Sequence, residues 1–342
     1  MRATIDLYER DENWEYASIT AGNLSELELT LGDVPAAEST AAQSVTYADR
    51  SKDAFGRMSK RTTHGDALHH AGKLDDSRTL FAEAETLQAE RQPGYPLLYS
   101  TPGYKYCDLS LAPAERAAWR AVPHQPQGAS PRFSVHPPAQ QPDASALRLI
   151  SEDLAAVEHR AQTSLDIVMR GSRNLLDVSL NHLTLGRVSL LRAVLDSPDQ
   201  HLPQARTALD TALTTLRQSN NSDDMPRALL PSAWLHALAG EWGMSVQRLN
   251  EAFAVATRGG NDPAKNYEGG MRLHLIDTLL YRVRLFGLPT HLDSPFPTNP
   301  NPEYPWPGRT PQMDLAEAAH LIEITGYHRR DEELADIRRF LM

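Results

Sequence analysis

Two copies of a helix–turn–helix pattern near the start of the chain place the strongest restriction on its fold. Residues 23–48 and residues 63–88 each contain an apolar helical stretch, a turn that begins with glycine, and a second helix rich in alanine. The turn glycines, Gly32 and Gly72, are 40 residues apart. A pattern that recurs in this way predicts a repeat architecture, in which neighbouring helical pairs stack and share one hydrophobic core.

Helical patterns continue to the end of the chain, although less regularly. In the segment 144–169 the apolar residues are three or four positions apart, as on one face of an α-helix. No stretch alternates convincingly between apolar and polar residues, so we predict an all-α solenoid of about six helical hairpins. Further helices are expected at 95–111, 175–195, 202–218, 226–240, 244–258, 271–287, 314–326 and 331–341. The helix at 95–111 is expected to have a shortened partner that starts at Pro113, since proline is common at the first position of a helix.

Two proline-rich inserts interrupt the helical pattern. Residues 113–142 and 289–311 contain 15 of the 24 prolines, and proline removes a backbone donor and disfavours helical geometry in the residue before it. In the second insert we expect Tyr304 and Trp306 to pack against a hydrophobic seam, the alternative being that this segment docks on another domain. The expected organisation is one continuous solenoid, with hairpins at 1–112, an insert at 113–143, hairpins at 144–288, a loop at 289–312 and helices at 313–342.

The start of the chain is unusual for a repeat array. Trp14 and Tyr16 lead into the first repeat, and no polar capping helix is expected before them. Exposed ends of repeat arrays usually need such a cap. We therefore expect this end to adjoin a further segment of a longer polypeptide or a partner.

Charge and composition narrow the class of function. The 342 residues carry a formal net charge of −10, so there is no basic excess for binding nucleic acid or an anionic membrane. The one cysteine, Cys107, cannot form an internal disulfide and is expected to be a small core residue. No apolar run reaches the roughly 20 residues of a membrane span, and no targeting sequence is recognised at the start. We expect a cytoplasmic protein without a nucleic-acid or membrane partner.

Several stretches resemble a known family. These are AGNLSELELTLGD, AERQPGYPLLYSTPGYKYCDL, LDVSLNHLTLGR, MPRALLPSAWL, GGMRLHLIDTLLYRVRLFG and DLAEAAHLIEITGYHRRDEEL. They are similar to bacterial tetratricopeptide-repeat (TPR) proteins and, more narrowly, to the repeat regions attached to a nucleotide-binding switch domain or effector domain in STAND-type ATPases. The resemblance implies a right-handed α-solenoid that acts as a sensor or scaffold in bacterial signalling or defence. It implies no catalytic residues or cofactor in this chain, which has no P-loop Gly-Lys-Ser/Thr.

In such arrays the first helix of each hairpin lines an inner groove, so the turn glycines and the helical period locate candidate groove residues. Because Arg and aromatic side chains anchor many recognition surfaces, we expect the basic and aromatic second half to accept an acidic or carboxylate-bearing peptide segment. The alternative is internal pairing among Asp277, Tyr281 and Arg284, with Arg187 and Trp234 packed in the core. The candidates for partner binding are Glu26, Asp66, His69, Tyr104 and Asp108 in the mainly acidic first half, and Arg187, Arg227, Trp234, His274, Asp277, Tyr281 and Arg284 in the second half.

The main expectation is a non-catalytic module that binds a protein or peptide partner or an attached effector domain. Two other classes of function are alternatives to it. The first is a metal-dependent enzyme, because Asp66 shares a helix face with His69 and His70 at spacings of three and four residues. The more ordinary interpretation of these three residues is a solvated or groove-lining helix surface. The second is a structural oligomerisation unit, in which the first hairpin stacks on another copy of the chain.

Overall fold

The computed structural model describes residues 1–122, 144–288, 297, 299–300 and 303–341, and the regular secondary structure of this part is entirely helical. The predicted all-α fold class is therefore confirmed for these residues. Their α-helices are α1 (Arg2–Arg10), α2 (Trp14–Thr30), α3 (Val34–Ser51), α4 (Ala54–His70), α5 (Leu74–Arg91), α6 (Ser100–Ala121), α7 (Ala144–Arg170), α8 (Leu175–Leu195), α9 (Pro198–Gln218), α10 (Met225–Leu238), α11 (Trp242–Ala256), α12 (Arg272–Arg282), α13 (Pro311–Thr325) and α14 (Asp331–Leu341). Short turns occur at η1 (Ser222–Asp224), η2 (Pro263–Lys265), the π-helical η3 (Val283–Gly287) and η4 (His328–Arg330).

The described residues form two compact units, each assembled from separate stretches of the chain. Unit 1 comprises Met1–Leu109, Gly259–Leu273 and Leu321–Arg330, and unit 2 comprises Ser110–Arg258, His274–His320 and Asp331–Met342. The boundaries expected from proline content follow chain order, whereas each unit combines early and late segments. Local composition carries no information about these long-range associations.

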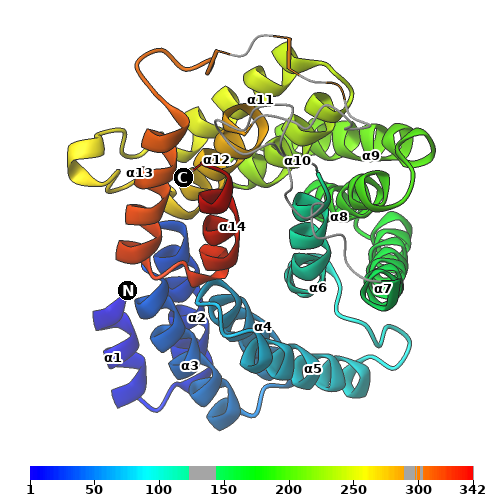
Figure 1. Ribbon diagram of the computed structural model, residues 1–342. Helices are drawn as coiled ribbons and strands as arrows, with labels where there is room; N and C mark the ends of the chain where they lie inside the picture. Colours follow the sequence, from blue (N-terminus) through cyan, green and yellow to red (C-terminus); the bar gives the residue numbers. More distant parts are fainter. Residues whose placement is uncertain (123–143, 289–296, 298, 301–302, 342) are drawn as a thin grey trace. The chain divides into compact units, whose positions relative to one another are not determined.

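In unit 1, helices α1 to α5 lie side by side in chain order (Figure 1). The closest associations are α2 with α3 and α4 with α5, the two pairs that the repeated pattern predicts. Helix α1 was not expected, and it covers the start of the first pair because Ile5 packs in one cluster with Ala17, Ala21 and Leu24 of α2. The expectation that no helix precedes Trp14 is therefore wrong.

The turn glycines adopt the backbone conformation that the repeated pattern requires. Gly32, Gly72 and Gly240 have φ angles of 74°, 77° and 76°, in the left-handed region that glycine enters without steric cost. After Gly32, the Asp33 amide donates to the Glu28 carbonyl, and equivalent bonds close the turns at Gly72 and Gly240. This is the Schellman arrangement, which satisfies carbonyls at a helix end and reverses the chain. All three turns therefore connect their helices in the same way.

Small side chains occupy equivalent positions where the two helices of a pair meet. In each pair, one small residue lies seven positions before the turn glycine and a second lies five positions after it. The six residues of the three pairs are all buried. In the first pair Ser25 Oγ donates to the Ala37 carbonyl at 2.8 Å, and in the second Ser77 Oγ donates to the Gly65 carbonyl at 2.6 Å. The three sets are Ser25 and Ala37, Gly65 and Ser77, and Ala233 and Ser245.

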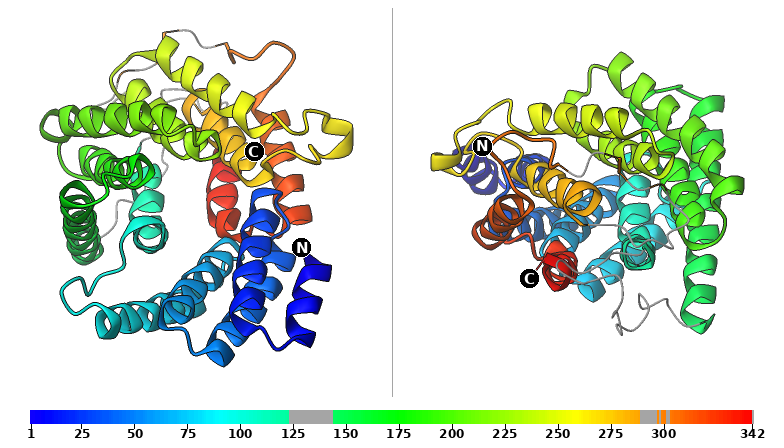
Figure 2. Two further views of the ribbon diagram at one scale, coloured as in Figure 1. Left: turned by 180° about the vertical axis from the view of Figure 1, so that it is seen from behind. Right: turned by 45° about the horizontal axis from the view of Figure 1, so that its top comes forward.

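In unit 2, successive helices from α7 to α11 contact one another, with α8 on α9 and α10 on α11 the most extensive (Figure 2). These two pairs match the pairs predicted at 175–218 and 226–258. Helix α6 differs from the prediction because it continues through Pro113, where a new helix was expected to start. On its second half, burial of Trp119 and the ion pair of Glu115 with Arg187 offset the backbone hydrogen bond that an internal proline removes.

The described part of the second proline-rich insert packs onto unit 2. Trp306 is buried and its indole nitrogen donates to Asn250 Oδ1 at 2.7 Å, while the Tyr304 hydroxyl donates to Asp314 Oδ2 at 2.6 Å. Tyr304 and Trp306 are therefore packed down, as expected. Residues 289–296, 298 and 301–302 of this insert, and residues 123–143 of the first insert, lie outside the described residues. None of the described helices is both long and apolar enough to cross a bilayer.

Candidate functional site

The five groove candidates of the first half lie on three helices of unit 1. Glu26 is on α2, Asp66 and His69 are on α4, and Tyr104 and Asp108 are on α6. The members on α4 and α6 are three or four residues apart, so each helix places them on a common face. Four of the five side chains are buried, and Glu26 has 50% of its side chain exposed. We call these five residues the first-helix cluster.

Lys105 connects the three helices of the first-helix cluster. Its amine donates to Glu26 Oε1 at 2.9 Å and lies 3.2 Å from Asp66 Oδ2, while its own side chain is 9% exposed. Lys105 is not among the candidates predicted from the sequence, because each of those was chosen singly for a position expected to face the groove. The available signal was a lysine three residues before Asp108, between Tyr104 and Tyr106.

Asp108 binds an arginine from a distant part of the chain. The two carboxylate oxygens accept hydrogen bonds from Arg329 at 2.6 and 3.2 Å, and both side chains are largely buried. Although burial opposes the charge of Arg329, the Asp108 carboxylate raises the pKa of its guanidinium above the ordinary value. Two parallel bonds to one carboxylate are the geometry that arginine supplies and lysine does not.

His69 lies beside this ion pair without joining it by a hydrogen bond. The ring is fully buried, its Nδ1 is 3.9 Å from Asp108 Oδ2, and neither ring nitrogen has a hydrogen-bond partner among the described residues. Burial, and then the positive charge of Arg329, hold the pKa of His69 well below its usual value. His69 is therefore a neutral imidazole at neutral pH.

His70 faces a different partner from His69. Its Nδ1 is 2.8 Å from the Asp66 carbonyl oxygen and 3.6 Å from Asp66 Oδ1. Its ring stacks on Tyr327, with the centroids 5.5 Å apart and the planes inclined by 22°. His70 thus neighbours the Asp66 carboxylate, whereas His69 neighbours the Asp108 carboxylate. Over the ranges that the structure describes, no group of three or more His, Cys, Asp or Glu side chains is arranged to hold a metal ion.

The helices that carry the first-helix cluster also contain a second buried amine. Lys60 of α4 extends along α2, where a Cβ atom on Gly22 would lie only 2.6 Å from its Nζ. Burial lowers the pKa of Lys60, and the nearby Glu26 carboxylate opposes that effect. The face formed by α2, α4 and α6 therefore combines three carboxylates with two amines, one of which loses its proton more readily than a free lysine.

Two groove candidates of the second half meet at a carboxylate in unit 2. Glu115 of α6 accepts a hydrogen bond from Arg187 of α8 at 3.0 Å and lies 3.4 Å from the hydroxyl of Tyr281 on α12. Glu115 and Arg187 keep only 7% and 12% of their side chains exposed. The basic side of the predicted groove thus holds a carboxylate, and that carboxylate belongs to the chain itself.

Aromatic candidates of the second half surround Trp119, one helical turn after Glu115. Trp234 stacks on Trp119 with a centroid separation of 3.7 Å and an angle of 8°, and Tyr281 meets the Trp119 ring edge-on at 5.2 Å. The Arg284 guanidinium carbon lies 4.6 Å from the centre of the same ring, a cation–π contact. Trp234 is 1% exposed, so in this conformation its ring contacts the protein interior.

The other three candidates of the second half are Arg227 on α10 and His274 and Asp277 on α12. Arg227 pairs with Asp224 at 3.2 Å at the start of α10 and keeps 28% of its side chain exposed. His274 and Asp277 are on α12, where His274 is half-buried and Asp277 is buried. Partner binding by the residues of either half stays a prediction. Cys107 is buried in α6, as expected.

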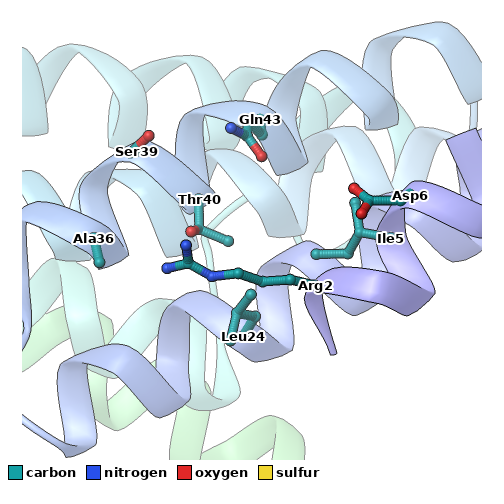
Figure 3. Close-up of a pocket in the computed structure, with 8 residues that line it drawn as sticks. All are labelled: Arg2, Ile5, Asp6, Leu24, Ala36, Ser39, Thr40 and Gln43. Atoms are coloured by element: carbon teal, nitrogen blue, oxygen red, sulfur yellow. The ribbon is translucent and has the colours of Figure 1, made fainter.

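A separate pocket of about 390 Å³ opens in unit 1 between α1, α2 and α3 (Figure 3). Arg2 forms part of its wall and pairs with Glu28 at 3.0 Å. None of the five residues of the first-helix cluster lines this pocket. It is lined by Arg2, Ile5 and Asp6 of α1, Leu24 of α2, and Ala36, Ser39, Thr40 and Gln43 of α3.

No protein-family model matches this chain, and no curated protein shows significant sequence similarity to it. The assignment to TPR proteins and the association with STAND-type ATPases therefore remain predictions from the resemblance.

Proposed function

We propose that this chain is a non-catalytic protein-interaction module that binds a protein or peptide partner on the face of α2, α4 and α6. One observation carries the proposal. The five first-half residues selected by turn position and helical period lie on three helices joined by Lys105, and Asp108 among them already binds the charged side chain of a distant segment. A face that holds one segment by paired charges has the chemistry to hold another.

The proposed architecture is a right-handed α-solenoid of TPR-like hairpins. Its support is the equivalence of three helix pairs, which share the turn at a left-handed glycine and the small residues where their helices meet. In such an array the first helices of successive pairs lie next to one another, and α2 and α4 are in contact in unit 1. This arrangement supports a binding surface made from first helices.

The proposed biological role is a sensor or scaffold, which transmits partner binding to an attached or associated effector domain. Its support is the resemblance to the repeat regions of STAND-type ATPases, and the location that we propose with it is the bacterial cytoplasm. The competing metal-dependent enzyme has less support, because no group of three or more His, Cys, Asp or Glu side chains in the described part of the chain is arranged to hold a metal ion.

Exposed apolar side chains on α2 support an oligomerisation unit as a second candidate. Tyr16, Ile19 and Leu27 are 53%, 41% and 45% exposed and occupy one side of the helix. A second copy that stacked there would remove this apolar surface from water. Light scattering over a range of concentrations tests the idea, because a stacking unit gains mass as concentration rises and a monomeric adaptor keeps a constant mass.

Selection from a random peptide library on the immobilised protein tests the interaction module. We expect the wild-type protein to enrich a common peptide sequence. The Glu26→Lys variant should lose it, because this change reverses the charge of the one largely exposed member of the first-helix cluster. The Glu15→Lys variant is a matched control on the same helix, and it should retain the peptide. Absence of any enriched sequence, or equal retention by all three proteins, would contradict the proposed function.

A further inference from the structure

The segment Gly326–Arg330 of unit 1 contacts the first-helix cluster as a bound peptide would. Tyr327 is 2% exposed and stacks on His70, while Arg329 places its guanidinium on Asp108. The segment therefore supplies one aromatic ring and one guanidinium to α4 and α6. These are the side-chain types that most often anchor recognition surfaces.

The backbone of the same segment approaches the second turn glycine. A Cβ atom on Gly72 would lie 3.2 Å from the backbone carbonyl of His328, which is tighter than ordinary contact. The absence of a side chain on Gly72 thus allows the backbone of the segment to approach the end of α4 closely, in addition to the role of this glycine in the turn. The contact explains why a small residue is needed on the side of the turn that faces the segment.

The segment is a short connection between two helices. It consists of a left-handed glycine, Gly326, followed by the short 3₁₀ turn η4, which joins α13 to α14. The amides of Tyr327, His328 and Arg330 donate to the carbonyls of Ile322, Gly326 and Tyr327, and this single turn has a shorter hydrogen-bonded ladder than the long helices that it contacts. Local opening of such a connection requires less free energy than unfolding of α4 or α6.

The Asp108 site needs a cation whenever it is closed to water. An ionised carboxylate that loses its partner while buried is strongly destabilised, so release of Arg329 favours entry of another guanidinium. His69 adds a second feature that points to a ligand, because it is a fully buried polar ring next to Asp108 with no hydrogen bond among the described residues. A ligand group that reached this ring would find an unused donor and acceptor.

Building on the proposed function, we propose that Asp108 and its neighbours on α4 form a receptor for a partner segment that carries an arginine and an aromatic residue. Tyr327–Arg330 occupies this receptor as an intramolecular ligand, and the partner binds by taking its place. The competing explanation is that the Asp108–Arg329 pair only holds α6 to the loop before α14.

Peptide binding to the full chain separates these explanations. The probe is a fluorescent peptide with the sequence of residues 325–332, measured by polarisation. The Arg329→Ala variant should bind it about tenfold or more tightly than the wild-type protein, because the intramolecular competitor has lost its guanidinium. Addition of Asp108→Asn to that variant should remove the gain, and a peptide carrying Arg329→Ala should not bind. Equal binding to wild type and Arg329→Ala, or a gain that persists with Asp108→Asn, would overturn the receptor.

A second measurement uses the wild-type protein and does not depend on the folding of a variant. Hydrogen exchange of the amides at Tyr327–Arg330 should accelerate several-fold when the peptide is added in excess, since the peptide displaces the segment. Unchanged exchange at saturating peptide would also overturn the receptor. Failure of either test while Glu26-dependent peptide selection persists rejects the arginine receptor alone, whereas loss of that selection rejects the proposed function.

Discussion

The buried His69 ring predicts how the stability of unit 1 depends on pH. The perturbation is His69→Leu, which replaces the imidazole with an apolar side chain of similar size. Neither ring nitrogen has a hydrogen-bond partner among the described residues. Replacing the ring with leucine therefore breaks no hydrogen bond to these residues. At about pH 7.5 we therefore expect the variant to be within about 1.5 kcal/mol of the wild-type stability.

The magnitude follows from the lowered pKa of His69. The native ring stays neutral below pH 6.5, whereas an unfolded histidine with a pKa of about 6.5 takes up a proton. The unfolded state then binds more protons, so stability is complete above about pH 6.5 and falls as the pH drops toward the native pKa. If the native ring stays neutral, the free energy of unfolding falls by roughly 1.4 kcal/mol for each pH unit below about 6.5. At about pH 5 the protein has therefore lost about 2 kcal/mol of stability.

Hydrogen exchange of the buried amides of α4 measures this effect where it arises. Opening free energies are compared at about pH 7.5 and about pH 5 after correction for intrinsic exchange rates. The wild-type protein should lose about 2 kcal/mol more than His69→Leu over this interval. His159→Asn on α7 is a matched control, because this histidine is exposed. Equal losses in wild type and His69→Leu would refute the inference that His69 is buried and neutral.

Three further substitutions test packing in unit 2, each by urea denaturation followed by circular dichroism. Gly186→Ala should destabilise by about 1–3 kcal/mol despite its better helix propensity, because the new methyl group would lie 2.7 Å from Leu209 Cγ. Gly243→Ala, at a helical glycine with open space around it, should instead stabilise by about 0.4–1 kcal/mol. Trp234→Ala should cost about 3–5 kcal/mol, since it empties a buried site and removes the stacking on Trp119.

Local sequence signals were sufficient to locate the helix pairs. They also identified the residues that share one face of the first helices, α2 and α4. Gly32 and Gly72 have the left-handed backbone that their turn roles imply, and counting back along the helical period from these turns selected Glu26, Asp66 and His69. These residues share a neighbourhood because a periodic helix repeats its orientation relative to its turn. The same reasoning applies to any pair with the same turn geometry.

The partners of this face could not be predicted in the same way. Arg329 is 221 residues from Asp108 in the sequence, and no periodicity connects two positions so far apart. Sequence reasoning placed Arg329 at a helix boundary, where a cation is ordinary. Only the fold shows that its guanidinium is buried on α6.

Continuity of α6 was missed for a related reason. Pro113 is a strong local signal for a helix start, and it suggested two helices where there is one. Contacts of Glu115 with Arg187 and of Trp119 with Trp234 hold the second half of α6 in place. Tertiary contacts of this kind override the low helix propensity of the sequence around Pro113. Their contribution cannot be judged from the sequence of α6 alone.

Several candidates of the second half contact other residues of the chain itself. Arg187, Tyr281 and Arg284 were expected to accept a carboxylate-bearing segment, and Glu115 supplies a carboxylate to the first two. What sequence alone left open was the source of that carboxylate, since an internal helix and an external peptide offer the same group. The internal contact leaves partner binding at this second location untested.

Site-specific photocrosslinking in the native host tests most directly whether the face of α2, α4 and α6 binds a partner. A photoreactive amino acid is placed at Glu26, which borders the first-helix cluster, or at Glu15 on the same helix as a control. The account predicts that position 26 captures a discrete partner protein, that excess peptide of residues 325–332 suppresses the capture, and that position 15 does not capture it. The same set of products from both positions, or no product from position 26, would contradict it.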